Sequence, residues 1–136
     1  ETPKPYATIS ITVDFSSSDS KAINKAIQLG GTQAKYNLIH VLETANATVY
    51  GEDTNDVERA EDTQLLMSYK QQLNEKGFEC DYTLGFGSPK VIIPKLVQQS
   101  DLLVMGTHGH TTFKDILFGT TVESVRHKIS IPLVLV

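Results

Sequence analysis

The sequence lacks several features that would mark large protein classes. No apolar run is long enough to span a bilayer and no signal peptide is evident, so we expect no membrane insertion. Cys80 is the only cysteine, which excludes an internal disulfide. In a strand-like segment this thiol is most simply a small buried hydrophobic side chain. A reducing compartment is compatible with these features, and we expect a cytoplasmic protein.

The sequence also lacks an excess of basic residues and a P-loop. Its 12 Lys and Arg against 16 Asp and Glu give a formal charge of -4, which argues against a nucleic-acid partner. The pattern G-x-x-x-x-G-K-[ST] does not occur, and no base stands beside an evident nucleophile. Phosphoryl transfer without such groups is slow, so we expect binding, with weak ATPase activity at most.

The length and composition indicate one globular domain over residues 1–136. The 136 residues are 40% hydrophobic and 21% charged, which suffices for a buried core. We expect residues 1–5 to form a flexible tail and residues 43–56 a long mobile loop. This loop is a candidate lid, although we favour the simpler interpretation of a solvated connection into the next helix. The chain begins at Glu1 without a methionine, so the domain of a larger transporter or signalling protein is an alternative.

Strand-like and helical patterns alternate along the chain. Strands are predicted at residues 7–13, 36–42, 78–84, 102–105 and 131–136, and helices at residues 16–30, 57–76, 88–97 and 120–128. The third strand is half exposed, as at a sheet edge. This alternation predicts an α/β fold: a five-stranded parallel open sheet with helices on both faces, similar to flavodoxin or Rossmann folds.

Three helices show signals that the structure can test. Polar residues 16–19 are predicted to cap the first helix, and Gly30 and Gly31 to end it. Pro94 should bend the third helix or make its regular part begin there. The predicted apolar face of the second helix includes Val57, Ala60, Leu65, Met67 and Leu73, and that of the third includes Val91, Ile92, Leu96 and Val97.

The winding of such a sheet places its first and fourth strands side by side. Ligands of open α/β sheets bind at this reversal, outside the carboxyl ends of the strands. The two loops at this place begin at Asp14 and Gly106. Asp14 is thus either a turn residue or a ligand contact, and its place opposite Gly106 favours the contact.

The loop after the fourth strand carries a glycine motif, G-x-x-G, nine residues, then G-[ST]. Gly106 and Gly109 allow backbone N–H groups to approach a phosphate closely. Gly119 leads to Thr120 and Thr121 at a helix start, where an anion is favoured. Thr120 and Glu123 alone would also form a capping box, and the glycines alone could serve turns. Together, at the place where the winding of the sheet reverses, the glycines and threonines favour phosphate binding.

The segments that carry this motif resemble the universal stress protein family, in its ATP-binding branch. The resemblance lies in residues 102–109 with Gly119 and Thr120, in residues 13–16, in His40 and Val41, and in the ending 131–136. It covers nearly the whole chain in order. It implies an adenine nucleotide alpha hydrolase-like fold, a homodimer through the last strand, Ile131–Val136, and a bound adenine nucleotide.

The resemblance also implies a role for each matching residue. Thr12, Val13 and Asp14 would lie near the adenosine, and Val41 would offer backbone groups to the adenine. The ribose and phosphates would be held by Met105, Gly106, His108, Gly109, Gly119, Thr120, Thr121 and Val122. The ligand would be ATP, or ADP or AMP, with Mg²⁺ or Mn²⁺ bridging its phosphates rather than sitting in a protein cage.

Other histidines carry less information. His108 and His110 lack a clear third ligand for a metal, and we expect no metal site there. His40 and His127 are expected to be structural or solvated. The function predicted is a nucleotide-binding regulatory or stress-response module. The alternative is a dimeric interaction module in which nucleotide is absent or only structural.

Overall fold

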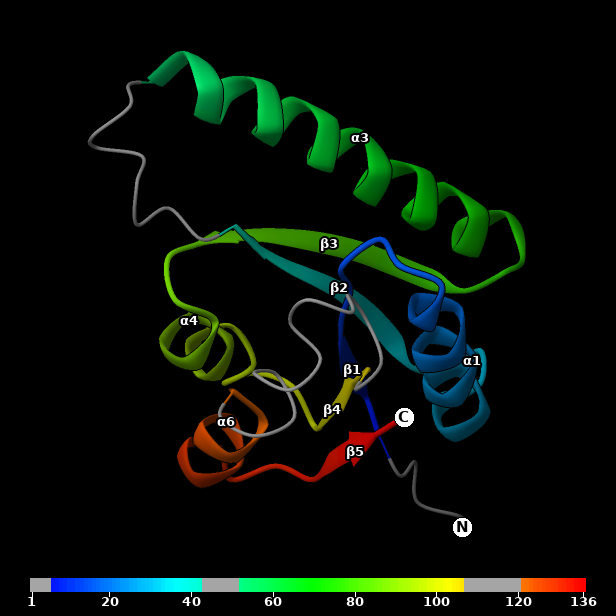
Figure 1. Ribbon diagram of the computed structural model, residues 1–136. Coiled ribbons are helices and arrows are strands. Elements are labelled where there is room, and N and C mark those ends of the chain that lie inside the picture. The colour runs from blue at the N-terminus through cyan, green and yellow to red at the C-terminus, as the bar shows by residue number, and fades with distance from the viewer. Residues whose placement is uncertain (1–5, 43–51, 107–120) are drawn as a thin grey trace, which may run out of the picture.

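A computed structural model describes residues 6–42, 52–106 and 121–136, with no side chains described for residues 52–59. Its order along the chain is β1 (Thr8–Thr12), α1 (Ser18–Gly30), β2 (Lys35–Leu42), α3 (Glu52–Glu75), β3 (Glu79–Phe86), α4 (Pro89–Leu96), β4 (Leu102–Met105), α6 (Val122–Lys128) and β5 (Leu133–Leu135). The predicted tail, residues 1–5, lies outside the described residues. Strands and helices alternate as predicted (Figure 1).

The strands form one parallel sheet in the order β3-β2-β1-β4-β5. This confirms the predicted five-stranded α/β fold. β1 pairs with β2 on one side and β4 on the other, with Ile9 opposite both Tyr36 and Leu102. The winding therefore reverses between β1 and β4, which places the loops after these strands next to each other.

Helices cover both faces of the sheet, and each face has its own core. Helices α1 and α3 lie on one side, α4 and α6 on the other (Figure 1). The successive residues Leu103 and Val104 of β4 belong to the two different cores and are both fully buried. A strand buried on both faces reads as a continuous apolar run, which is why residues 102–105 were predictable.

One polar pair is buried inside this apolar frame. Ser10 of β1 is 0% exposed, and its hydroxyl lies 2.5 Å from the hydroxyl of Ser100, just before β4. Each hydroxyl gives the other a hydrogen-bond partner, as buried polar groups require. The pair fastens the entry of β4 to the centre of the sheet.

Helix α3 begins earlier than predicted and buries a different face. It starts at Glu52 rather than Val57, so the last part of the predicted loop 43–56 is helical; residues 43–51 lie outside the described residues. The predicted apolar positions Leu65 and Met67 are 44% and 52% exposed, whereas Leu66 is fully buried. Several apolar residues in succession left the choice of buried face to the tertiary packing.

Helix α4 runs through Pro94 instead of beginning there. Proline has no N–H, so the carbonyl of Lys90, four residues earlier, lacks its helical donor. The ammonium of Lys128, at the end of α6, donates to this carbonyl at 3.3 Å. The apolar face also differs from the prediction, because Ile93 is buried while Val91 is 43% exposed.

The last strand is shorter than predicted, whereas the first predicted residue of the last helix, Thr120, lies outside the described residues. Helix α6 begins at Val122, and β5 covers Leu133–Leu135 within the predicted range 131–136. Backbone contacts continue beyond both ends of β5, since Leu103 N–H donates to Pro132 and Val136 N–H donates to Met105. Among the helices described, none has the length and apolar character needed to cross a membrane.

Candidate functional site

The carboxyl ends of β1, β2 and β4 surround a small cavity of about 110 Å³. Helix α4 closes one side of it through Pro89 and Ile93. The cavity lies at the winding reversal, where open α/β sheets bind their ligands. The other lining residues come from the strand ends and the turn after β1: Thr12, Val13, Asp14, Ser18, Ile39, His40, Val41, Met105 and Gly106.

Six of the predicted site residues meet in this cavity: Thr12, Val13, Asp14, Val41, Met105 and Gly106. Two others, Thr121 and Val122, are buried at the start of α6. The remaining four, His108, Gly109, Gly119 and Thr120, lie outside the described residues. Of the glycine motif only Gly106 is therefore described, and the binding of a phosphate by this motif stays a prediction.

Gly106 leaves β4 with its backbone pressed against the start of α1. A Cβ at this position would lie 3.2 Å from Ser18 Oγ and 3.7 Å from Ser18 Cβ. Its φ is outside the left-handed region, so close approach rather than conformation favours glycine here. The absence of a side chain keeps the cavity open at the point where β4 and α1 converge.

Asp14 serves the turn between β1 and α1. Its Oδ1 accepts hydrogen bonds from Ser16 N at 3.1 Å and from Ser16 Oγ at 2.5 Å. Ser16 Oγ also lies 2.9 Å from Ser18 Oγ, which connects the carboxylate to the residue facing Gly106. Among the described residues Oδ2 accepts no hydrogen bond. Asp14 thus fills the turn role through one oxygen and leaves the other for a ligand.

His40 fastens the end of β1 to α3. Its Nδ1 lies 2.8 Å from the carbonyl oxygen of Val13, and its Nε2 lies 3.2 Å from Asp62 Oδ2. Both partners offer acceptor oxygens, so the ring can donate to either of them through the nitrogen that carries its hydrogen. The expected structural role therefore exists, but His40 also lines the cavity, which the sequence did not indicate.

Asp19 organises the same turn from inside the first turn of α1. Its side chain takes two backbone N–H groups: Asp14 N donates to Oδ1 at 3.1 Å and Phe15 N to Oδ2 at 2.7 Å. The hydroxyl of Tyr69, on α3, donates to Oδ2 at 2.9 Å. Burial raises the pKa of Asp19 to about 6, and these donors oppose the increase.

This arrangement corrects the prediction that residues 16–19 cap α1 through their side chains. Ser17 is the residue before the helix and makes no side-chain capping hydrogen bond. The C-terminal signal holds: Gly31 has a φ of 61° and its N–H donates to Ile27 at 2.8 Å. The Asp19 carboxylate accepts hydrogen bonds from the turn before α1, at Asp14 and Phe15, and not from the N–H groups of the helix itself.

The whole chain matches known proteins in sequence. A profile of the universal stress protein family matches residues 5–136. A putative universal stress protein of Staphylococcus haemolyticus is 30% identical over 131 residues, covering 90% of this chain and 79% of that protein. One from Staphylococcus aureus has the same 30% identity over 131 residues, with coverage of 90% and 79%. The chain belongs to the universal stress protein family.

Solved structures agree with this membership. The hypothetical protein MJ0577 has a TM-score of 0.84 at 25% identity, covering 97% of this chain and 96% of that one. A universal stress protein from Arabidopsis thaliana with AMP bound has a TM-score of 0.66 at 19% identity, covering 96% and 90%. One from Archaeoglobus fulgidus in complex with dAMP also has 0.66 at 19%, covering 96% and 98%. A third complex holds cAMP, with a TM-score of 0.67 at 21% identity and coverage of 97% and 97%. At these lower identities the likeness shows the fold alone, and the nucleotides are properties of those proteins.

Several lining residues of this universal stress protein domain were missed from its sequence. Ile39 was predicted only as part of a strand, Pro89 only as a helix start and Ser18 only as part of a capping run, and Ile93 was not among the predicted apolar positions of its helix. The topology could have indicated two of these residues. Ile39 lies near the end of β2, which is beside β1, and Pro89 begins α4, which follows β3 at the same edge of the sheet. Across the described residues, no group of three or more His, Cys, Asp or Glu side chains could hold a metal ion.

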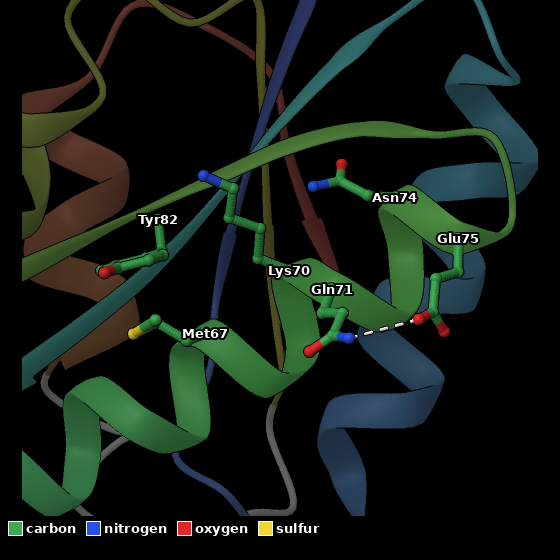
Figure 2. A pocket seen from close by; sticks show the side chains of 6 residues that line it. All are labelled: Met67, Lys70, Gln71, Asn74, Glu75 and Tyr82. Carbon is green, nitrogen blue, oxygen red and sulfur yellow. Dashed lines mark hydrogen bonds between the residues drawn. The ribbon is translucent and has the colours of Figure 1, made fainter.

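A larger hollow of this domain lies away from the winding reversal, between α3 and β3. It measures about 550 Å³ and is lined by Met67, Lys70, Gln71, Asn74, Glu75 and Tyr82 (Figure 2). Gln71 donates to Glu75 at 3.2 Å along the exposed side of α3. Charged and amide side chains at the surface form most of the lining, so we assign the candidate site to the smaller cavity.

Proposed function

We propose that this universal stress protein domain binds an adenine nucleotide, ATP or ADP or AMP, as a regulatory or stress-response module. The observation that carries the proposal is the meeting of six predicted contact residues in one cavity at the winding reversal. The cavity offers an apolar wall for a base and a carboxylate oxygen, Asp14 Oδ2, for a ribose or base donor. Nucleotide complexes of three proteins with this fold support the ligand class.

The phosphates would leave the cavity past Gly106 towards the rest of the glycine motif. Gly106 fits this path, because a Cβ there would fill the approach beside Ser18. Mg²⁺ or Mn²⁺ would bridge phosphate oxygens, since such ions keep several non-protein ligands in nucleotide sites. The resemblance supplies His108, Gly109, Gly119 and Thr120 for the phosphate tail, with Thr121 and Val122 at the helix start.

We propose binding with slow hydrolysis at most. Among the described lining residues of the cavity there is no lysine or arginine. Phosphoryl transfer needs charge stabilisation of the transferring group, typically by such residues together with a metal ion. With the described lining residues alone we therefore expect a bound nucleotide to be hydrolysed slowly.

The first test is to denature freshly purified protein, identify any released nucleotide, and titrate ATP with Mg²⁺ into the emptied protein by calorimetry. Bound adenine nucleotide, or a saturable heat of binding, supports the proposal. If no nucleotide is released and no binding is detected, nucleotide binding is rejected. A folded dimeric interaction module would then be the better description.

Asp14→Ala is expected to weaken ATP binding by roughly tenfold to a hundredfold, because a hydrogen bond to a charged group contributes about 1.5–3 kcal/mol. Calorimetry measures the loss, and circular dichroism checks the fold. Asp14→Asn is the matched variant that separates the two roles, since its amide oxygen still accepts from Ser16 whereas its NH2 group replaces the acceptor Oδ2 with a donor. Unchanged affinity in Asp14→Ala would remove Asp14 from the site.

We also propose that two copies of the domain pair through β5. The two sheet edges differ in their backbone groups. At the β3 edge, Asn74 Oδ1 accepts from Cys80 N at 3.2 Å and Asp81 Oδ1 accepts from Tyr82 N at 2.8 Å. These side chains occupy donors that another strand would need, which blunts this edge. Leu135, on the β5 edge, is 37% exposed and supplies apolar surface for a two-fold contact.

Leu135→Asp is therefore expected to convert a dimer to a monomer, because the two-fold places two new carboxylates close together. Sedimentation velocity at micromolar concentration measures the change. Leu65→Asp is the matched control, an exposed leucine of α3 that should leave the dimer intact. A monomeric wild type at that concentration would reject the dimer directly.

A further inference from the structure

The turn that forms one wall of the cavity is held in an unfavourable conformation. Phe15 has a φ of 66°, a region that side-chain-bearing residues avoid. Such a conformation persists only where surrounding contacts impose it. The nearest constraint is Asp19, 3% exposed, whose carboxylate takes the N–H groups of both Asp14 and Phe15. A single side chain thus fixes the backbone from which the Asp14 carboxylate projects.

Helix α3 supports this turn at two points. Tyr69 donates its hydroxyl to Asp19, and Asp62 binds His40, which in turn binds the carbonyl of Val13. The Phe15 ring packs against both supports, with its centroid 4.5 Å from that of His40 and 6.0 Å from that of Tyr69. Helix α3 therefore contacts the cavity wall through the rings of Tyr69, Phe15 and His40 and the carboxylates of Asp19 and Asp62.

We propose that Asp19 is a positioning residue for nucleotide binding, which holds the Asp14 turn in its binding conformation, and that Tyr69 makes this hold depend on helix α3. The proposal rests on the proposed nucleotide function. Asp19 does not line the cavity, so its effect reaches the ligand through the backbone of Asp14 and Phe15. No local sequence pattern indicates this role, because Tyr69 lies 50 residues from Asp19 along the chain.

Protonation of Asp19 gives the proposal a distinctive signature. The carboxylate form accepts all three hydrogen bonds, whereas the neutral acid is a weaker acceptor and carries a donor of its own. The titratable groups that face Asp19 directly are Asp14 on the same turn and Tyr69 on α3. His40 of β2 is connected to this group by its ring contact with Phe15, and Asp62 of α3 by its hydrogen bond to His40. Because the pKa of Asp19 is about 6, its positioning effect should be complete near pH 8 and lost near pH 5.

The same group affects stability in the opposite direction, which separates positioning from acid unfolding. Burial raises the Asp19 pKa from 3.8 to about 6, so the folded state binds a proton that the unfolded state does not between these values. The contribution of this group to stability is therefore greatest at low pH and is lost as pH rises through about 6. A fall in affinity on acidification cannot come from this group destabilising the fold.

The experiment compares ATP affinity of Asp19→Asn with that of the wild type, with Mg²⁺, at about pH 5 and about pH 8. The ratio of the two affinities is the readout, because it cancels titration of the nucleotide phosphate, whose pKa is near 6. We expect Asp19→Asn to bind roughly tenfold more weakly at the higher pH, within the usual range of coupling between a support and a site, and roughly equally at the lower pH. Circular dichroism at both values confirms that each protein is folded.

Tyr69→Phe tests the link to α3. Removing its hydroxyl takes away a donor that lowers the Asp19 pKa, so the midpoint of the wild-type pH profile should move upward. Tyr82→Phe is the matched control, a tyrosine of β3 in the separate hollow of Figure 2, and should leave the profile unchanged. If both proteins are folded and bind ATP but the ratio of their affinities is the same at both pH values, the role of Asp19 is rejected while the nucleotide function stands. Absence of wild-type ATP binding at either pH overturns the nucleotide function and, with it, this proposal.

Discussion

Gly106→Val is expected to abolish measurable ATP binding while the domain remains folded. A Cβ at this position already lies 3.2 Å from Ser18 Oγ, and the two methyl groups of valine add volume beside a cavity of only about 110 Å³. Overpacking of this kind lowers the stability of the fold by about 1–3 kcal/mol. The ligand in addition loses the space that the methyl groups occupy, so we expect its affinity to fall by roughly a hundredfold or more. The backbone at Gly106 is not left-handed, so valine brings no conformational strain. Calorimetry with ATP and Mg²⁺ measures the loss, and thermal denaturation checks the fold.

A smaller substitution shows whether Ser18 is the source of the clash. Gly106→Ala places only the Cβ, so we expect an intermediate loss of roughly tenfold. Combining it with Ser18→Ala removes the hydroxyl at 3.2 Å and leaves the Ser18 Cβ at 3.7 Å, an ordinary contact. The double variant should therefore recover part of the affinity. Wild-type affinity in folded Gly106→Val would place the nucleotide somewhere other than this cavity.

The sheet was predictable because its strands carry local signals. Residues 102–105 form a continuous apolar run, and the alternating residues of β1 and β3 mark strands by period alone. Parallel topology then followed from the alternation of strands and helices, and it predicted where on the sheet a ligand would bind. The topology placed the loops that begin at Asp14 and Gly106 at this cavity, and the resemblance supplied the other four predicted residues that line it, Thr12, Val13, Val41 and Met105.

What could not be predicted depends on partners distant in sequence. Leu66 rather than Leu65 is buried because α3 packs on the sheet with one particular face, and its composition permits several. His40 and Asp62 are 22 residues apart, and their contact exists only once α3 lies over β2. Lys128 serves the carbonyl freed by Pro94 from a different helix. Such long-range polar contacts leave no periodic trace in a sequence.

Gly30 illustrates how packing can reverse a local preference. It is the last residue of α1, where alanine is intrinsically better than glycine by about 1 kcal/mol in a helix. A Cβ there would nevertheless lie 2.6 Å from Ile9 Cδ1, 2.7 Å from the Tyr36 hydroxyl and 2.8 Å from Ala34 Cβ. That hydroxyl is itself fixed by its 2.6 Å hydrogen bond to the carbonyl of Gly31. Three atoms, one on β1, one on β2 and one just before β2, must therefore move together.

Gly30→Ala is consequently expected to destabilise the domain by about 2 kcal/mol, because an overpacking cost of up to about 3 kcal/mol outweighs the helical gain. Urea denaturation measures this as a lower midpoint at an unchanged slope. Gly77→Ala is the matched control: its φ of 94° strains an alanine, but a Cβ there meets no atom within 4 Å. Its cost is backbone strain alone, about 1 kcal/mol. If Gly30→Ala proved as stable as the wild type, the junction of α1, β1 and β2 would have to be looser than the packing of Ile9 and Tyr36 implies, and the local helical preference would decide the outcome after all.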